Sequence, residues 1–339
     1  MEKLKLASLF CGCGGTDVGI EGGFTFNNTY YTRNNAVVVY ANDIEGGARD
    51  IFEANFNLTV DPRDIRNISS DEIPDHDILT AGFPCQSFSV IAQNPPRLGC
   101  RTPLGKLFFE VARVLRDKQP ICFIAENVKG LLSANNKKAF PLVLKEFREC
   151  GYEVNYKILN AAWFGVPQKR ERVFIVGFRN DLGIYPVFPE YNDNSDNFVP
   201  LKGALENEID GKYFFSRRAV DGMMRVREKM NKGRAQDINQ PCNTVNSHLA
   251  KISLNSTDPV LKIGGKYRRF TPREVARIQS FHEDFKLVGA EFQQYKALGN
   301  AIAPVVMWHV FRSIQQQLDD REKGTIRGKD LDYQLALQF

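Results

Sequence analysis

Cys85 is the side chain in this sequence whose setting best suits covalent chemistry. It lies in the segment Ala-Gly-Phe-Pro-Cys-Gln-Ser-Phe-Ser, residues 81–89, which directly follows the apolar run at 77–81. A cysteine thiolate is a strong nucleophile that can add to an electron-poor carbon. Pro84 restricts the backbone just before the cysteine, so the thiol would leave the run in a defined direction. A buried, unreactive cysteine is the alternative, and the rest of the sequence must decide between the two.

A glycine-rich turn near the start of the chain indicates a ligand-binding site. The segment Phe-Cys-Gly-Cys-Gly-Gly, residues 10–15, follows an apolar run and precedes a helical stretch. Glycines there let the backbone approach a ligand, and Asp43, at the end of the next apolar run, is placed to bind a ribose diol. The full dinucleotide pattern G-x-G-x-x-G is not present, and a tight structural turn would explain these glycines equally well. The turn therefore indicates a site without identifying the cofactor.

Alternating strands and helices are expected to position these groups. Apolar runs typical of buried strands occur at 4–10, 37–41, 77–81, 121–125 and 172–177. Helical patterns follow the glycine turn and recur at 104–118 and 141–150. This alternation predicts the α/β class, with a doubly wound, mostly parallel sheet that helices cover on both faces. Ligands and catalytic groups gather in the loops that follow such strands, which is where Cys85 stands.

The second half of the chain has a different character. Residues 185–200 are crowded with Asn, Asp, Pro and Tyr, as in a linker, and the segments from there to about 270 are short, basic and irregular. The capping box Thr-Pro-Arg-Glu at 271–274 predicts a helix to about residue 281. Another helix is expected after Asn300, and the charged stretch from 319 is expected to be loosely held. The polar insertion at 24–39 is expected to form a surface hairpin.

Composition and charge exclude several classes of protein. The chain has 339 residues, of which 43% are hydrophobic and 25% charged, as in soluble globular proteins. No apolar run approaches the roughly 18 residues of a membrane helix, and no secretion signal is apparent, so we expect a cytoplasmic protein without membrane contact. Seven scattered cysteines do not form a disulfide framework. Four histidines do not complete a ligand set around Cys11 and Cys13, so no metal is expected.

Basic charge is concentrated in one region. Residues 201–280 contain 16 Lys and Arg against 8 Asp and Glu, a net charge of +8 in a chain whose total is only +5. Such a concentration is expected where a protein faces a polyanion. A solvated basic surface is the alternative, and charge alone does not distinguish the two.

Six short motifs occur in a family-like order. They are Phe10-x-Gly-x-Gly-Gly15, Gly82-Phe-Pro-Cys-Gln86, Glu126-Asn-Val128, Gln168-Lys-Arg-Glu-Arg172, Arg273-Glu-x-Ala-Arg-x-Gln-x-Phe281 and Gly299-Asn-Ala-Ile302. Together they resemble the bacterial DNA (cytosine-5) methyltransferase family of restriction-modification type, from about residue 6 to residue 314. Each motif is weak by itself, but six in order are highly specific.

The resemblance implies a fold and a division of the chain. The fold would be that of the Rossmann-like S-adenosylmethionine-dependent methyltransferases, with a second, smaller domain for DNA recognition. Residues 1–185 would form the catalytic and cofactor-binding domain and 186–270 the target recognition domain. Residues 271–298 would be a hinge segment, and 299–339 a C-terminal helix that returns to the catalytic domain, followed by a charged tail.

The resemblance also implies catalytic roles. It places five side chains in the catalytic site: Cys85, Glu126, Arg172, Arg170 and Gln168. Cys85 would add to carbon 6 of cytosine, which makes carbon 5 nucleophilic enough to take the methyl group. Glu126 would bind N3 and the exocyclic amine, and Arg172 would hold the base. Arg170 and Gln168 flank that arginine, and Asn127 would support the loop. A structural ion pair is the alternative for Glu126 and Arg172.

By the same matching, eleven residues would contact the cofactor, S-adenosylmethionine. They are Phe10, Gly12, Gly15, Asp43, Ile44, Asp64, Ile65, Pro84, Leu107, Asn300 and Ile302. Asp43 would bind the ribose hydroxyls, Ile44 would lie against the adenine, and Asp64 would accept from its amino group. The chain departs from the family pattern at Ser8, Ile44 and Lys106, which bears on cofactor affinity and not on the reaction.

Double-stranded DNA is the partner that the resemblance implies. Attack on a stacked cytosine is impossible, so the base must rotate out of the helix at a cost of about a few kcal/mol. Residues 89–102 match the family's mobile catalytic loop, with a merely decorative loop as the alternative. The basic segment 198–266 matches the target recognition region, and Thr244-Val245 resembles a short motif late in it. The expected DNA contacts are Gln86, Ser89, Arg101, Arg217, Arg218, Arg225 and Arg227.

The sequence disfavours three other functions. An RNA-modifying enzyme of the same fold is disfavoured by the Gly-Phe-Pro-Cys loop and the dedicated basic segment. A silent DNA-binding module is disfavoured by the intact Cys85, Glu126 and Arg172, and a nicotinamide-dependent oxidoreductase by the incomplete glycine pattern. We expect a monomer that acts in the bacterial cytoplasm, at the nucleoid when bound to DNA, with a cognate restriction endonuclease as a separate partner.

Overall fold

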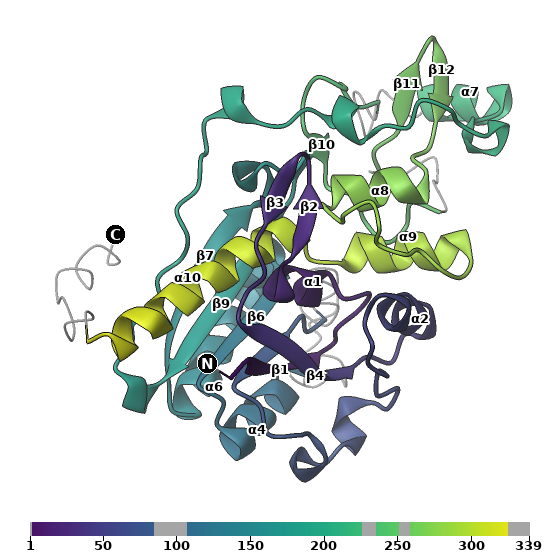
Figure 1. Cartoon of the computed structure of the whole chain (residues 1–339). Coiled ribbons are helices and arrows are strands. Elements are labelled where there is room, and N and C mark those ends of the chain that lie inside the picture. The colour runs from purple at the N-terminus through teal and green to yellow at the C-terminus, as the bar shows by residue number, and fades with distance from the viewer. Residues whose placement is uncertain (1, 85–106, 226–234, 251–257, 325–339) are drawn as a thin grey trace.

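A computed structural model describes residues 2–84, 107–225, 235–250 and 258–324 (Figure 1). Its centre is a six-stranded sheet in the order β4-β1-β5-β6-β9-β7. These strands are β4 (Ala36–Asn42), β1 (Leu4–Leu9), β5 (Ile78–Ala81), β6 (Cys122–Val128), β9 (Glu171–Arg179) and β7 (Tyr152–Asn160). The first four are parallel, and β9 runs antiparallel to both β6 and β7. The predicted α/β class with a mostly parallel sheet is confirmed.

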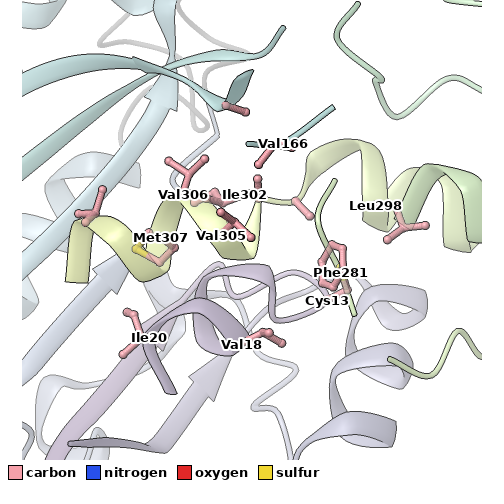
Figure 2. Packing of buried hydrophobic residues seen from close by; sticks show 14 of the residues in the cluster. Cys13, Val18, Ile20, Val166, Phe281, Leu298, Ile302, Val305, Val306 and Met307 are labelled. Atoms are coloured by element: carbon pink, nitrogen blue, oxygen red, sulfur yellow. The ribbon is translucent and has the colours of Figure 1, made fainter. Parts of the chain in front are cut away.

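Helices cover both faces of this sheet, as expected. Helices α1 (Gly15–Glu21) and α10 (Pro304–Glu322) pack together on one face, and α4 (Leu107–Lys118) and α6 (Ala139–Glu149) lie on the other. Alternate side chains of each strand serve the two faces: Ile124 of β6 belongs to the cluster under α1 and α10, and Phe123 to the cluster under α4 and α6. Figure 2 shows Val18 of α1 facing Val305 of α10.

Some elements of the larger part were not predicted from the sequence. Strand β7 at the sheet edge has the sequence Tyr-Glu-Val-Asn-Tyr-Lys-Ile-Leu-Asn, whose alternation of apolar and polar residues is the signal of a strand. Helix α2 (Gly46–Asn55) starts with two glycines, which conceal its helical pattern, and it packs against α9 (Glu291–Asn300). The short helix α5 (Ala134–Lys137) precedes α6.

The smaller part lies at the upper right of Figure 1 and consists of short elements. They are α7 (Arg217–Arg225), β10 (Cys242–Asn243), β11 (Leu261–Ile263), β12 (Lys266–Arg268), α8 (Pro272–Ile278) and α9. Strands β11 and β12 form a hairpin, and β10 pairs in parallel with β8 (Gln168–Lys169) of the larger part. Thr271 and Glu274 form the predicted capping box of α8. The stretch 185–200 contains neither an α-helix nor a strand, which agrees with a linker.

The insertion at 24–39 does contain a hairpin, formed by β2 (Phe24–Phe26) and β3 (Thr29–Tyr31). It is anchored on α10: the Tyr31 and Trp308 rings meet edge to face with centroids 5.2 Å apart, and Trp308 Nε1 donates to the Thr32 carbonyl at 2.8 Å. Helix α10 continues to Glu322, so the first residues of the stretch expected to be loose are helical. Within the described ranges, none of the helices combines the length and apolar character needed to cross a bilayer.

Candidate active site

The glycine turn after β1 has a backbone that few residues other than glycine adopt. Gly12 and Gly14 have φ of 57° and 87°, and a β-carbon on Gly15 would lie 2.3 Å from the Ile302 carbonyl oxygen. Asp43, at the end of β4, holds this turn: its Oδ2 accepts from the Gly12 N–H at 2.8 Å, and its Oδ1 accepts from the Glu45 N–H at 2.8 Å. Burial raises the pKa of Asp43, and these two N–H groups partly oppose the rise.

The surface around this turn fits an adenosyl group. A β-carbon on Gly12 would meet no atom within 4 Å, so there is open space directly above the turn. Ile44, beside Asp43, is 59% exposed, which leaves its apolar side chain free to lie against a base. Phe10 adopts a left-handed φ of 55° and continues the same turn. The predicted contacts at Phe10, Gly12, Gly15, Asp43 and Ile44 therefore lie together and are compatible with S-adenosylmethionine.

The other predicted cofactor contacts differ in their accessibility. The Asp64 carboxylate is paired with Arg66, whose Nε donates to Oδ1 at 2.9 Å and whose Nη2 donates to Oδ2. The side chains of Ile65 and Leu107 are buried in the core beneath α4. Asn300 is exposed at the end of α9, whereas Ile302 is buried against the glycine turn and Pro84 is half-buried.

Glu126 and Arg172 are brought together by neighbouring strands. Glu126 on β6 pairs with Phe174 on β9, and Arg172 stands two residues from Phe174, on the same face of the sheet. Arg172 Nε lies 3.1 Å from Glu126 Oε1, and both side chains are largely buried. Burial raises the pKa of Glu126, while the positive charges of Arg172 and Arg170 lower it. The predicted carboxyl and guanidinium thus form one ion pair at the carboxyl end of β6.

The segment that leads to Cys85 lies beside this pair. A β-carbon on Gly82 would be 4.0 Å from Glu126 Oε2 and 3.8 Å from the Phe10 carbonyl oxygen. Asn127 Nδ2 donates to the Phe83 carbonyl at 2.9 Å, as expected of a residue that supports this loop. The backbone is therefore fixed up to Pro84. Cys85 itself lies outside the described residues, as do the predicted site residues Gln86, Ser89, Arg101 and Arg227.

Gln168 and Arg170, which were expected to flank Arg172 in the catalytic site, bind distant segments of the chain. Gln168 is fully buried; its Oε1 accepts from the Val245 N–H at 2.9 Å and its Nε2 donates to Gln279 Oε1 at 2.8 Å. Arg170 is 3% exposed and donates to the Val245 carbonyl at 2.9 Å. Their polar atoms are directed into the junction between the two parts of the chain, because β8 runs alongside β10.

The predicted DNA contacts that the structure describes lie on the smaller part. Arg217 and Arg218 are exposed at the start of α7, where both guanidinium groups can reach a polyanion. Arg225 is the last residue of that helix.

Two charged residues near the site, one fully buried and one half-buried, were not predicted. Asp17 of α1 is fully buried beneath the glycine turn, and burial raises its pKa to about 7, an effect that the nearby Ser8 hydroxyl only partly opposes. Arg113 of α4 holds the loop that contains Asp64, donating to the carbonyls of Ile65 at 3.1 Å and Ile68 at 3.0 Å. Arg113 carried a signal in the sequence, since it interrupts the apolar pattern of its helix.

The other cysteines that the structure describes are unsuited to nucleophilic chemistry. Cys11, Cys13, Cys122, Cys150 and Cys242 are free and buried. Cys100 lies outside the described residues. Burial raises the pKa of the Cys13 thiol to about 12 and that of Cys11 as well, so both remain protonated. In the part of the chain that the structure describes, no group of three or more His, Cys, Asp or Glu side chains could hold a metal ion.

A cleft of about 870 Å³ opens elsewhere on the molecule. It lies between the β2–β3 hairpin, the end of α2 and the connection from α8 to α9, and Arg33, His282 and Lys286 are among its polar lining residues. None of the predicted catalytic or cofactor contacts lines it. The cleft is therefore separate from the candidate active site.

Comparison with known proteins gives one consistent result. A family model described as C-5 cytosine-specific DNA methylase matches residues 4–316. The type II methyltransferase M.FnuDI of Fusobacterium nucleatum is 35% identical over 347 residues, covering 94% of this chain and 96% of the relative. The type II methyltransferase M1.ScrFI of Lactococcus lactis subsp. cremoris is 34% identical over 328 residues, covering 95% of this chain and 80% of the relative.

Solved structures share the fold. The Entamoeba histolytica methyltransferase EhMeth superimposes with a TM-score of 0.74 at 17% sequence identity, over 94% of this chain and 99% of the other. The family match extends over both parts of the chain, and the two sequence relatives are covered over 96% and 80% of their length. The chain therefore belongs to the C-5 cytosine-specific DNA methylase family and is a DNA methyltransferase that transfers the methyl group of S-adenosylmethionine to carbon 5 of cytosine.

Proposed function

We propose that this enzyme methylates a cytosine that has rotated out of a specific double-stranded DNA sequence, through a covalent bond between Cys85 and carbon 6. The observation that supports this is the contact between Glu126 and Arg172 beside the end of β5. The backbone from Gly82 to Pro84 passes next to the Glu126 carboxyl, and Cys85 is the next residue in the chain. A nucleophile, a proton donor and a cation would thus converge on one pyrimidine ring.

The proposed reaction begins with addition. The Cys85 thiolate forms a bond to carbon 6, and the electrons of the 5,6 double bond make carbon 5 nucleophilic while Glu126 holds a proton at N3. Burial raises the pKa of Glu126, which favours the protonated form that this step needs. S-adenosylmethionine supplies an electrophilic methyl group to carbon 5. Methyl transfer leaves S-adenosylhomocysteine. Water then takes the carbon 5 proton, the 5,6 double bond re-forms as the Cys85 thiolate leaves, and N3 returns its proton to Glu126.

Arg172 has two tasks in this proposal. Its guanidinium holds the Glu126 carboxyl in place, and it can donate to the carbonyl oxygen of the base, where negative charge develops. Asn127 fixes the Phe83 carbonyl and thereby the direction in which Cys85 approaches. Asp43 and the glycine turn hold the adenosyl end, and we place Ile44, Asp64, Ile65, Pro84, Leu107, Asn300 and Ile302 around it, with no metal.

We further propose that the enzyme is the protective methylase of a restriction-modification system. The sequence relatives are named as type II methyltransferases, which supports this assignment. A separate restriction endonuclease would then cleave the same sequence when it is unmethylated. In this proposal the enzyme acts as a monomer in the bacterial cytoplasm, and residues 186–270 read the target sequence, with Arg217, Arg218 and Arg225 near the phosphates.

Bisulfite sequencing of DNA from cells that express the chain tests this function directly. The wild-type enzyme should protect one cytosine within a single short sequence, and Cys85→Ala should remove that protection. Cys150→Ala is the matched control, because this thiol is buried between α4 and α6, away from Glu126. Methylation by Cys85→Ala at the wild-type level would refute the covalent route. Methylation of folded RNA in place of duplex DNA by the purified enzyme would refute the substrate.

A further inference from the structure

Three consecutive residues ahead of Arg172 bind two consecutive residues of the smaller part. Gln168 Oε1 accepts from the Val245 N–H at 2.9 Å, and Arg170 Nη1 donates to the Val245 carbonyl at 2.9 Å. Between them, the Lys169 carbonyl accepts from the Thr244 hydroxyl at 2.8 Å. Side chains of the segment 168–170, which leads into Arg172, therefore bind both the N–H and the carbonyl of Val245.

The same side chains reach a third segment, on the cofactor side. Arg170 Nη2 donates to the carbonyls of Gly299 and Ala301, both at 3.0 Å. Gln279, the partner of Gln168, donates to the Leu298 carbonyl at 2.6 Å. These carbonyls flank Asn300 and precede Ile302, whose own carbonyl lies over Gly15 of the glycine turn.

The three segments approach too closely to move independently. A β-carbon on Gly299 would lie 2.2 Å from the Asn246 carbonyl carbon, so backbone meets backbone there. Arg170, Arg172 and Ile302 line one small cavity beside the sheet. A buried network with these fixed partners has few alternative arrangements, so a shift in one segment must be followed by the others.

We propose that Gln168 and Arg170 are positioning residues that couple the Thr244–Val245 segment of the smaller part to Arg172 and to the cofactor side at Asn300–Ile302. Neither residue would touch the base. Binding of DNA to the smaller part would instead hold Arg172 against Glu126 and hold the segment 299–302 against the glycine turn. Occupancy of the cofactor site would in return favour DNA binding. This inference rests on the proposed function, because it takes the DNA as the ligand of the smaller part.

The coupling is measured as a thermodynamic cycle. The dissociation constant of the duplex identified by bisulfite sequencing is determined with and without saturating S-adenosylhomocysteine. In the wild-type enzyme the ligand should tighten DNA binding at least about fivefold, within the usual range for coupled sites, and DNA should tighten binding of the ligand by the same factor. A factor of one in an enzyme that methylates this duplex would overturn the proposal but leave the proposed function intact.

Variants then assign the coupling to the junction. Arg170→Lys replaces two terminal nitrogens, Nη1 toward Val245 and Nη2 toward the 299–301 segment, by a single nitrogen on a shorter side chain. Gln168→Glu loses the donor to Gln279. Each variant should bring the factor to about one. Their kcat should fall at least about tenfold, while the dissociation constant of S-adenosylhomocysteine alone changes less than about threefold. A wild-type coupling factor in either variant would overturn the proposal. It would also be overturned if a variant bound both ligands more weakly to the same extent that its folded state was destabilised.

Two milder substitutions test the coupling in variants that are expected to fold. Thr244 is half-buried, so Thr244→Val should fold, lose the bond to the Lys169 carbonyl and reduce the coupling factor. Thr244→Ser keeps the hydroxyl and should restore it; equal coupling in these two variants would count against the junction. Arg179→Lys is the matched control, because Arg179 also donates to a carbonyl, that of Gln119, but at the far end of β9. Its coupling should match the wild type.

Discussion

The groups that surround a buried carboxyl in this enzyme decide how its pKa is shifted. Glu126 and Asp17 are both buried carboxyls, but Glu126 faces two guanidinium groups, whereas Asp17 faces the Ser8 hydroxyl and the carboxylate of Glu21. Burial raises the pKa of each, and only Glu126 has cations that oppose the rise. The two guanidinium groups therefore stabilise the ionised form of Glu126, whereas the described groups around Asp17 do not include a cation that would stabilise its ionised form.

Asp17→Asn should stabilise the enzyme at neutral pH. The folded-state pKa of Asp17, about 7, lies above the ordinary value of 3.8, so the stability that the protonated form contributes is lost as the pH rises from 3.8 through 7. Asparagine does not ionise and escapes this loss. Between pH 5 and pH 7 the difference in unfolding free energy between the variant and the wild type should change by about 2–3 kcal/mol in favour of the variant.

Denaturant unfolding of both proteins at several pH values measures this difference. Asp50→Asn is the control, because this aspartate is exposed on α2 and its substitution should change the unfolding free energy little. Parallel stability curves for the wild type and Asp17→Asn between pH 5 and pH 8 would show that Asp17 is ionised in the folded enzyme at both ends of the range.

Secondary-structure elements of the smaller part are held by one buried ion pair. Arg268, the last residue of β12, donates to both carboxylate oxygens of Glu274 at 2.7 Å, and the two side chains are 2% and 0% exposed. Glu274 also accepts from the N–H groups of Thr271 and Glu206, at 2.9 and 3.0 Å. The pair therefore joins the β11–β12 hairpin, the start of α8 and the segment after the linker.

Arg268→Met should destabilise the fold by about 3–5 kcal/mol, because it leaves a buried carboxylate without its cation. The double variant Arg268→Met, Glu274→Leu should recover part of this loss, since no unpaired charge then remains. Arg277→Met is the matched control: it breaks the exposed pair with Glu283 and should cost less than about 1 kcal/mol. Thermal unfolding of the four proteins provides the test, and equal midpoints for the two single variants would contradict it.

The whole molecule divides its charge between its two parts. The net charge of +8 on residues 201–280 leaves the rest of the chain negative, since the total is +5. The exposed cations of the smaller part include Lys212, Arg217, Arg218, Lys262 and Lys266. This asymmetry orients a polyanion toward the recognition side before any base is read.

DNA affinity should consequently fall steeply with salt. If five or more phosphates are contacted, the slope of log K against log salt concentration is about −4.5 or steeper. Arg217→Gln combined with Arg218→Gln should make the slope shallower by about two and weaken binding to all sequences alike. Lys145→Gln on α6 is the control, because Lys145 is exposed on the opposite side of the sheet and should leave the slope unchanged. An unaltered slope in the double variant would place the phosphates elsewhere.

Much of the fold followed from local patterns. Five apolar runs became five strands of the central sheet, and the capping box at 271–274 started a helix where expected. Strand β7 was missed although its alternation was present, and α2 was missed because glycines occupy its first turn. Such patterns are readable because side-chain periodicity depends on only a few neighbouring residues.

The sequence alone determined the family and the order of the motifs. The structure then showed that neighbouring strands bring Glu126 and Arg172 to 3.1 Å from each other. Only the tertiary structure decided that Gln168 and Arg170 belong to the junction, and that Asp17 is buried beneath the glycine turn. The physical reason is the distance along the chain: Arg170 finds its partners 75, 129 and 131 residues away. Whether a polar side chain meets a ligand or a carbonyl depends on which distant segment the fold brings to it.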